Sequence, residues 1–357
     1  MCLANTVMAS SSTQAGATAN ESILAPVMNL EGHEPWTVSL PNGEHHEYKH
    51  VSYISYFPDS KQMISRSSDK TIRRWDLRKG KEIEEARAVY ECVQVVGLSR
   101  DGRWVVAAQA GETLKANELE TGIERTFHDG DWIDCIDISA DSTLLAGGSY
   151  NCKVRVWNLN TGELVAGSFE SGGGLVEALR FSEDSRKLAI LSHLEERHLQ
   201  VWDVQTQKLD VQRSTHYVLG SNFPVFWTTK DKSIVTAFTL TDDDLTMIYE
   251  CDASTLKTVG APFKGHTSTI NCLALSSDCV LLASSSYRSI KLWAFESREL
   301  LASFDVKCPI TLVLSPDSRQ LAYTTFHDTK IHISNIPANI LTNTSTSKRA
   351  DLLNFVQ

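Results

Sequence analysis

A four-residue turn pattern recurs seven times along the chain, and its regular spacing limits the fold more than any other feature of the sequence. Each copy has the form Ser-x-Asp-small or a close variant of it. The intervals between the aspartates are 42, 40, 43, 47, 47 and 39 residues, and the aspartates are Asp59, Asp101, Asp141, Asp184, Asp231, Asp278 and Asp317. A period of this length is typical of solenoids, propellers and arrays, in which each unit buries its apolar face only against its neighbours.

A second marker keeps the same period. An aromatic–acidic pair, or a replacement of it, follows each turn: Trp75-Asp76, Asn117-Glu118, Trp157-Asn158, Trp202-Asp203, Tyr249-Glu250, Trp293-Ala294 and Ser334-Asn335. In the third unit, alternating residues 133–138 precede the turn, apolar residues 144–146 follow it, and strands are expected over 154–157 and 164–166. Four strands of about 5–6 residues with connections of about 4–6 fill one unit. The sequence therefore predicts an all-β protein.

The units resemble WD40 repeats over about residues 23–337, and residues 63–76 are the best single copy. The resemblance implies one seven-bladed β-propeller with four-stranded antiparallel blades. The blades are expected near residues 51–87, 93–128, 133–170, 176–213, 223–264, 270–305 and 309–335 plus 23–31. Residues 1–22 and 338–357 are expected to be flexible tails.

The last unit supplies only three strands, over about 309–314, 320–325 and 330–335. Residues 23–33, which end in Gly32-His33, resemble the fourth strand of unit five, which ends in Gly265-His266. We therefore expect the N-terminal strand to complete the last blade, because this removes two open sheet edges. Deleting residues 1–33 should then destabilise the whole ring.

The family resemblance also implies a buried hydrogen-bond relay that joins a His, a Ser or Thr, an Asp and the Trp of one unit. Such a relay is structural, because a buried indole N–H and a buried carboxylate need partners. The members expected in unit one are Ser67, Asp69 and Trp75, with either His33 or His50 as the histidine. Those expected in unit three are His128, Ser149, Asn151 and Trp157, and those in unit six are His266, Ser285 and Trp293.

Charge and cysteine spacing narrow the functional classes. The formal charge of −10, from 34 Lys+Arg and 44 Asp+Glu, argues against nucleic acid or an anionic membrane as the main partner. The first 22 residues do not resemble a signal peptide, and the eight cysteines never lie closer than seven residues apart. This spacing does not indicate a zinc knuckle or a disulfide scaffold. We expect a cytoplasmic or nuclear protein with no cofactor and no metal.

The sequence contains one exact match to an enzyme motif. His46-Glu47-Tyr48-Lys49-His50 fits H-E-x-x-H, which binds zinc when both histidines lie on one helical face. Here the motif follows Pro41-Asn42-Gly43 and runs into an expected strand, so residues 34–49 are interpreted as a polar insertion. A metal-dependent enzyme that uses this His-rich insertion remains an alternative, as does weaker metal binding by His45, His46 and His50.

The favoured function is a non-catalytic scaffold that binds other proteins or peptides, alone or within a multiprotein complex, through propeller loops. Aromatic residues and Arg are common interface anchors. The candidates on the loops that enter first strands or join second and third strands are Trp132, Arg66, Tyr150, Tyr287, Arg288, His193 and His327, with Trp36 in the insertion. Tyr150 and Tyr287 could instead pack between blades.

A ubiquitin-ligase role is the second alternative. Trp75-Asp76-Leu77-Arg78 resembles the W-D-x-R box of WD40 substrate receptors in cullin-RING ligases. The surrounding unit is locally basic, with nine Lys/Arg against five Asp/Glu over residues 61–87. A solvated blade edge is the favoured explanation of that charge, and a patch for an acidic partner segment is the alternative.

Overall fold

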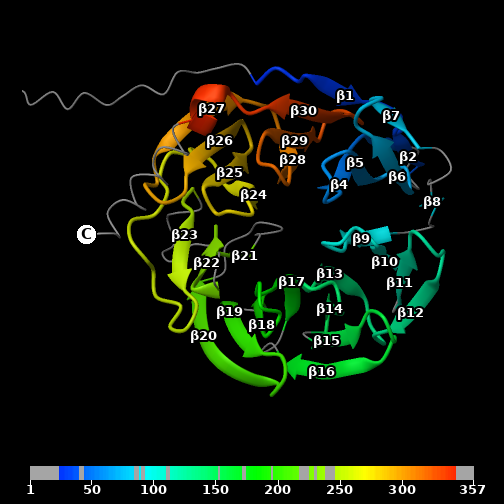
Figure 1. Ribbon diagram of the computed structural model, residues 1–357, viewed down its shortest axis with the longest axis vertical. Coiled ribbons are helices and arrows are strands. Elements are labelled where there is room, and N and C mark those ends of the chain that lie inside the picture. The colour runs from blue at the N-terminus through cyan, green and yellow to red at the C-terminus, as the bar shows by residue number, and fades with distance from the viewer. Residues whose placement is uncertain are drawn as a thin grey trace, which may run out of the picture.

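A computed structural model of the chain shows strands grouped into sheets that stand around a central axis (Figure 1). The structure describes residues 24–39, 44–83, 88–89, 93–109, 113–151, 153–170, 174–193, 196–216, 225–228, 231–237 and 246–342. The chain passes round the ring once, and seven antiparallel sheets form its blades. The predicted all-β, seven-bladed β-propeller is confirmed.

Blades 1 to 4 follow the order of the sequence. Blade 1 contains β4 (Val51–Tyr56), β5 (Gln62–Ser67) and β6 (Thr71–Asp76), with β7 (Lys81–Glu82) and β8 (Ala88–Val89) on its outer edge. Blade 2 contains β9 (Val93–Leu98), β10 (Trp104–Gln109), β11 (Thr113–Glu118) and β12 (Glu124–His128). Blade 3 contains β13 (Ile133–Ile138), β14 (Leu144–Ser149), β15 (Lys153–Asn158) and β16 (Leu164–Glu170). Blade 4 contains β17 (Leu175–Phe181), β18 (Lys187–His193), β19 (Glu196–Asp203) and β20 (Lys208–His216).

Blades 5 to 7 complete the ring. Blade 5 contains β21 (Val225–Trp227), β22 (Ser233–Thr236) and β23 (Tyr249–Asp252). In place of a continuous fourth strand, residues 257–263 bond to the edge of β23, for example through Val259 N and Glu250 O at 2.8 Å. Blade 6 contains β24 (Ile270–Leu275), β25 (Leu281–Ser286), β26 (Ser289–Ala294) and β27 (Leu300–Asp305). Blade 7 contains β28 (Pro309–Leu314), β29 (Gln320–Thr325) and β30 (Ile331–Asn335), with β1 (Met28–Leu30) beside β30.

The recurring turn owes its sequence to a fixed set of hydrogen bonds between the first two strands of a blade. In blade 3 the Ser139 hydroxyl donates to Asp141 at 2.6 Å and accepts from the Leu144 amide at 2.8 Å. The residue after the Asp is left-handed, as in Ser142 with φ 60°. Small or polar residues tolerate that conformation best, which explains the fourth position of the pattern. In blade 5 the turn lies one residue earlier than expected, because Asp231 itself has φ 53°.

The N-terminal strand closes the ring, as the sequence predicts. Strand β1 pairs antiparallel with β30, and Met28 lies opposite Ile333 while Leu30 lies opposite Ile331. Figure 1 shows this blue strand lying along the outside of the last, orange-red blade. The side chain of Leu30 is fully buried. One end of the chain is thus held by the other.

The apolar core lies between neighbouring blades rather than in one central mass. The cluster between blades 7 and 1 contains Leu30, Val51, Ile54, Tyr56, Met63, Trp75, Ala322, Ile331 and Ile333. Similar clusters join blades 1 and 2, 2 and 3, 3 and 4, 4 to 6, and 6 and 7. A blade therefore buries its faces only when both neighbours are present, which makes ring closure a condition for the stability of every blade.

The segment after the last strand is ordered where a flexible tail was expected. Residues 338–342 form a short helix, and Ile340 is 4% exposed. Ile340 packs with Leu24 and Phe304 in the cluster of blades 6 and 7, so burial of its apolar side chain holds the helix in place. The expectation of a flexible tail is wrong for these five residues. Residues 1–22 and 343–357 lie outside the described residues.

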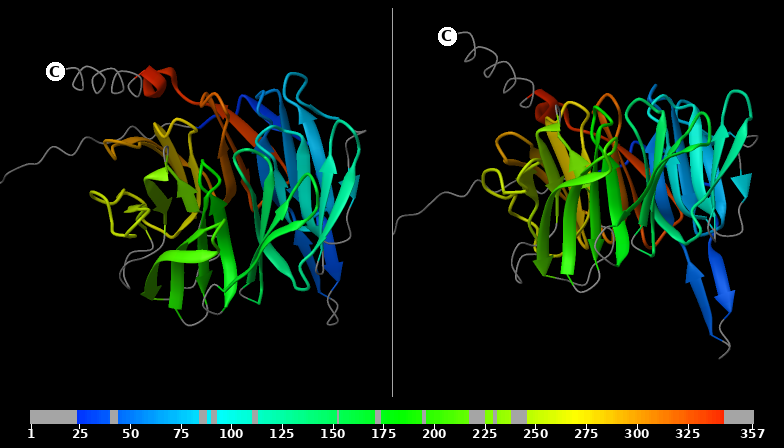
Figure 2. Two further views of the ribbon diagram at one scale, coloured as in Figure 1. Left: turned by 60° about the horizontal axis from the view of Figure 1, so that its bottom comes forward. Right: turned by 90° about the horizontal axis from the view of Figure 1, so that it is seen from below.

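The insertion before blade 1 forms a β-hairpin of β2 (Trp36–Ser39) and β3 (His45–Tyr48). Figure 2 shows this hairpin projecting from one face of the ring, while the short C-terminal helix lies at the opposite face. The hairpin lies in the connection between β1 and β4, where residues 34–49 were interpreted as an insertion. In the described part of the chain we find no helix with the length and apolar character needed to cross a membrane.

Candidate interaction face

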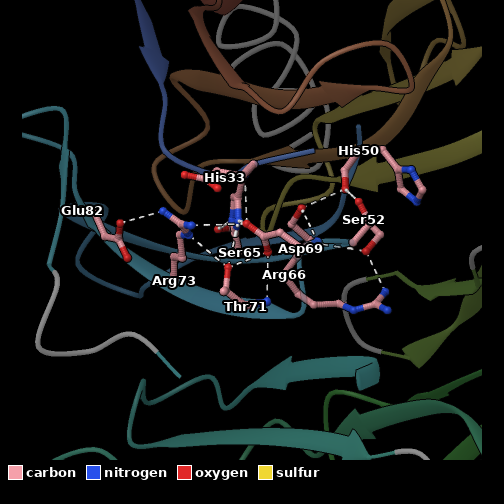
Figure 3. Close-up of polar contacts among 12 residues, drawn as sticks. His33, His50, Ser52, Ser65, Arg66, Asp69, Thr71, Arg73 and Glu82 are labelled. Atoms are coloured by element: carbon pink, nitrogen blue, oxygen red, sulfur yellow. Dashed lines mark hydrogen bonds and ion pairs between the residues drawn. The ribbon is translucent and has the colours of Figure 1, made fainter. Parts of the chain in front are cut away.

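A buried polar relay fixes the third strand of blade 1 (Figure 3). The Ser65 hydroxyl accepts from the indole N–H of Trp75 at 2.7 Å. It also lies 2.7 Å from Nε2 of His33. The other ring nitrogen of His33 lies 2.9 Å from Asp69, which also accepts from Thr71 at 2.6 Å. Burial by itself favours the protonated form of Asp69, but these hydrogen bonds and the His33 charge outweigh it and hold its pKa well below the usual range.

Arg73 adds charge to this relay. Its guanidinium lies 3.3 Å from Asp69 and 2.9 Å from Glu82, and its side chain is only 7% exposed. The relay therefore connects β6 to the outer strand β7 as well as to the segment that enters the blade. Such a network stabilises a fold while it is complete and is costly to break, because each remaining buried group loses its partner.

Two serines were assigned to the relay wrongly. Ser67 donates to the His50 carbonyl at 3.1 Å, and Ser65 takes the place expected for it. In blade 6 Ser284 bonds to Trp293 at 2.8 Å and to His266 at 2.7 Å, so Ser284 replaces the predicted Ser285. The histidine of unit one is His33 rather than His50. Asp69, Trp75, His266 and Trp293 lie in the relay as expected.

No such relay forms among the residues of blade 3 that the structure describes. His128 is exposed, and Ser149 bonds to Asn151 at 2.8 Å rather than to Trp157. The position opposite Arg155 is Gly147, whose added Cβ would lie 3.1 Å from the Trp157 ring. A serine at this position would require the indole and Leu114 to shift by a few tenths of an ångström. The buried Asp129 instead forms an ion pair with Arg155, which supplies the polar connection that the relay makes elsewhere.

The exposed aromatic side chains gather on one side of the ring. We call this side the entry face; it consists of the connections that enter each first strand and the turns between second and third strands. Antiparallel four-stranded blades bring both kinds of loop to the same end. Every large aromatic side chain classed as exposed in the described residues is on this face, namely Trp36, Tyr48, Trp132, Tyr150, Tyr287 and Phe326. The exposed aliphatic residues lie elsewhere: Val27, Ile123, Leu164, Val165, Leu209 and Val259.

Six of the eight candidate binding residues point to solvent on this face. Tyr150 is 67% and Tyr287 57% exposed, so the alternative that they pack between blades is not what the structure shows. The side chain of Trp132 is 41% exposed. Trp132 lies beside Tyr150, because the Tyr150 backbone amide donates to the Trp132 carbonyl at 2.8 Å. Arg288 and His327 are exposed, and Trp36 lies in the hairpin.

The other two candidates are engaged inside the protein. Arg66 donates to the Ser52 hydroxyl at 2.7 Å and to the Val93 carbonyl, and thereby joins blades 1 and 2. His193 lies 2.9 Å from Glu177, which also pairs with Arg197 at 2.8 Å. Arg66 and His193 are therefore held by contacts within the protein and do not belong to the exposed anchors of the entry face.

A continuous line of rings crosses the entry face from blade 7 to the hairpin. We call it the aromatic row: Phe326, His50, Tyr48 and Trp36. Successive ring centroids are 5.4, 6.3 and 6.0 Å apart, and the Lys70 ammonium lies 4.8 Å from the centre of the Trp36 ring. These contacts fix the rings before any partner arrives.

A cavity of about 410 Å³ lies between blades 6 and 7 beside this row. It is lined by Tyr287, Arg288, Asp305, Lys307, Cys308 and His327. Its rim is held by backbone hydrogen bonds from Cys308 N to Tyr287 O at 2.8 Å and from Phe326 N to Cys308 O at 2.9 Å. The Tyr287 hydroxyl, like that of any tyrosine with an ordinary pKa, can donate a hydrogen bond at neutral pH. A hydrogen bond to the Cys308 side chain raises the pKa of Tyr287.

Comparison with known proteins agrees with this geometry. The family model of the WD domain, G-beta repeat, matches residues 39–76, 123–158 and 256–294, which end on the third strands of blades 1, 3 and 6. The relatives include the WD repeat-containing protein 26 homolog of Arabidopsis thaliana, 24% identical over 51% of this chain and 31% of that protein. The chain is a WD40-repeat β-propeller protein.

Two further relatives of this WD40 propeller come from animals. WD repeat-containing protein 18 of Homo sapiens is 24% identical over 69% of this chain and 61% of its own length. Transcription initiation factor TFIID subunit 5 of Caenorhabditis elegans is 28% identical over 44% of this chain and 24% of its own length. The chain thus spans less than two thirds of each of these three relatives.

A solved structure resembles the whole ring. One chain of the Kuenenia stuttgartiensis hydrazine synthase superposes with a TM-score of 0.68 at 14% identity, over 81% of this chain and 96% of that one. At this identity the likeness shows the fold alone.

The H-E-x-x-H letters do not form a zinc-protease site in this propeller. Residues 45–48 are a strand, not a helix, so His46 and His50 do not share a helical face. His50 instead stacks on Phe326. Among the described residues, no group of three or more His, Cys, Asp or Glu side chains is placed to hold a metal ion.

Sequence reasoning missed Phe326, Tyr48 and Lys307. Phe326 directly follows β29 as Tyr287 directly follows β25, so aligning the units by turn position would have found it. Tyr48 was considered only as part of the metal motif. Lys307 lies between blades, where no repeat marker points, and only the folded ring brings it to Arg288 and His327.

The stability of this propeller should depend on pH through His266. Burial lowers the pKa of His266 to about 3, and the Lys291 ammonium acts in the same direction. Below pH 6.5 this imidazole is protonated in the unfolded chain, whereas in the native protein it stays neutral until about pH 3. The free energy of unfolding should therefore decrease as the pH is lowered from about 6.5 to about 3. This residue alone should contribute up to about 1.4 kcal/mol per pH unit.

Urea midpoints at about pH 7.5 and about pH 5 would measure this effect. His266→Gln should lose less stability between the two pH values than the unsubstituted protein, although it is less stable at both. His327→Gln, at an exposed position, is the matched control and should keep the original difference. Equal differences in the His266→Gln variant and the unsubstituted protein would contradict the assignment.

Proposed function

We propose that this WD40 propeller is a non-catalytic scaffold that docks partner proteins on its entry face. The observation that carries the proposal is the segregation of exposed side chains: in the part of the chain that the structure describes, the six exposed aromatic rings share this face, and the exposed aliphatic residues do not. Large exposed aromatics are anchors in protein interfaces because they bury much area with few rotatable bonds. Loops on a rigid scaffold are also where recognition residues concentrate.

We also propose that the protein works within a larger assembly in the cytoplasm or the nucleus. The formal charge of −10 disfavours nucleic acid as the direct partner. The relationship to a protein named as a TFIID subunit supports a role inside a multiprotein complex. WD40 repeats in the relatives support an interaction role over a catalytic one.

Substitution of the exposed rings tests the proposal. Tyr287→Ser with Phe326→Ser, and separately Trp132→Ser with Tyr150→Ser, should reduce capture of cross-linked partner proteins by about tenfold or more, as loss of anchor residues does. The control is Leu164→Ser with Leu209→Ser, which removes two exposed apolar side chains from outer strands and should keep capture unchanged. All three variants should retain the melting temperature, because exposed substitutions change stability little.

The control decides the outcome. If the Leu164/Leu209 variant loses partners as strongly as the aromatic pairs do, the entry face is not the docking face. If no variant changes capture, the scaffold proposal fails for this surface.

A ubiquitin-ligase receptor is the second candidate. Trp75 is buried, and Asp76 accepts from the backbone amides of Arg78 at 2.9 Å and Lys79 at 3.1 Å. Only Arg78 of the four-residue box is therefore exposed for contact, after β6. In the same capture experiment, Arg78→Ala should remove a co-purifying ligase adaptor, and an unchanged adaptor would rule this candidate out.

A further inference from the structure

The cavity between blades 6 and 7 holds more positive than negative charge. Arg288 and Lys307 line it together with one carboxylate, Asp305, and with His327. Among the described residues, no ion pair within 4.0 Å forms for Arg288, Lys307 or Asp305. The half-buried Arg298, by contrast, is paired with Glu250 at 2.7 Å. The cations of the cavity are thus available to an incoming anion, in a chain of net charge −10.

The cavity walls are set before a ligand binds. The turn of blade 6, the connection to blade 7 and the turn of blade 7 are joined through Cys308 to Tyr287 and through Phe326 to Cys308. Val306 N adds a third bond to Arg288 O at 3.2 Å. A site fixed by the backbone loses little conformational entropy on binding.

The aromatic row continues from this cavity. Phe326 is adjacent to the cavity residue His327 and is the first ring of the row. The centroid spacings of 5.4, 6.3 and 6.0 Å are close to the distance between alternate side chains of an extended strand, about 6.6 Å. A peptide in this conformation can place one side chain in the cavity and alternate side chains over successive rings.

We propose that the entry face binds an extended acidic peptide segment of a partner protein. An Asp or Glu side chain enters the cavity and pairs with Arg288 and Lys307, with the Tyr287 hydroxyl as a further donor. Alternate apolar side chains of the same segment pack on Phe326, His50, Tyr48 and Trp36. This inference rests on the proposed scaffold function and specifies the chemical character of the partner segment.

The test uses the full-length protein on a support and synthetic peptide pools of about ten residues with apolar side chains at alternate positions. The four pools differ at one fixed position, which is Glu, Gln, Lys or phosphoserine. The Glu pool should be retained at least about tenfold more than the Gln pool, as expected for a hydrogen-bonded charge pair. Tyr48→Ser with Phe326→Ser should lower retention of the Glu pool.

Charge reversal separates recognition from a merely structural effect. Arg288→Glu with Lys307→Glu should transfer the preference from the Glu pool to the Lys pool. The matched control is Arg319→Glu, which reverses an exposed arginine directly before β29, at the turn of blade 7 that begins at Ser315 and lies away from the entry face, and it should keep the preference for Glu. All variants should melt as the unsubstituted protein does, because these side chains are exposed.

Three results would overturn the inference. They are equal retention of the Glu and Gln pools, an equal change in the Arg319→Glu control, and stronger retention of the phosphoserine pool, which would assign a phosphate instead. If peptide pools show no preference while the Tyr287/Phe326 variant still loses captured proteins, the acidic-peptide inference fails and the scaffold proposal stands.

Discussion

Replacing Leu30 by alanine is expected to lower the free energy of unfolding by about 2–5 kcal/mol, as for other fully buried leucines. Leu30 lies in β1, the strand that completes blade 7, opposite Ile331. Its side chain packs with Trp75 of blade 1 and Ile333 of blade 7, so the cavity left behind would weaken the closing interface on both sides. Deletion of residues 1–33 should be more damaging, because it also exposes the β30 edge and removes His33 from the relay.

Val27→Ala is the matched control for Leu30→Ala. Val27 is in the same segment, and its backbone amide bonds to Ile333 O at 2.8 Å, but its side chain is 56% exposed. The control should change stability by about 0.5 kcal/mol or less. Urea unfolding of both variants decides the matter. A Leu30→Ala protein as stable as the control would mean that ring closure does not depend on this strand.

Replacing Asp69 by alanine is expected to cost about 3–5 kcal/mol, because it leaves buried charged and polar groups without a partner. Asp69 contacts His33 at 2.9 Å, Thr71 at 2.6 Å and Arg73 at 3.3 Å, and its side chain is 8% exposed. Hydrogen bonds and the His33 charge lower the pKa of Asp69 in the native protein. The stability that Asp69 contributes is therefore fully present above about pH 4, where the carboxyl group of the unfolded chain is ionised. That contribution is lost as the pH falls through the native value.

A pair of serine variants tests which hydroxyl serves the relay. Ser65→Ala should destabilise the protein by about 1–3 kcal/mol, since the indole N–H of Trp75 and Nε2 of His33 would both lose a partner. Ser67→Ala removes a bond to the His50 carbonyl at 3.1 Å and a long bond from the Asp69 amide at 3.4 Å, and it should cost about 0.5–1.5 kcal/mol. Both side chains are buried in β5, so the comparison holds burial constant. The reverse order of stability would show that the relay runs through Ser67.

The serine assignments show where repeat patterns stop being informative. Ser65 and Ser67 alternate along one strand and therefore face the same side of the sheet. Only the register distinguishes them: Ser65 lies opposite Arg73, two residues before Trp75, and Ser284 lies opposite Lys291, two residues before Trp293. The turn of blade 6 is one residue shorter than that of blade 1, so counting from the turn selects Ser285, which faces the other side.

The repeat pattern predicted only part of the entry face. The sequence located Trp132, Tyr150 and Tyr287 on loops of one end, because the strand order within a blade fixes which loops share a face. It did not bring Phe326 to His50, which lie 5.4 Å apart between ring centroids although they come from opposite ends of the chain. That contact exists only because the ring closes and makes blade 7 the neighbour of blade 1.

The sequence by itself determined the number of units, their strands and the strand that closes the ring. Turns and alternation are short-range properties, which a few residues encode wherever they stand in the chain, as Ser139 and Asp141 do. Only the tertiary structure decided which polar atoms are paired and which charges share a cavity, such as Arg288 and Lys307. Those contacts join residues from different blades, and their distances follow from register, turn length and closure rather than from any local pattern.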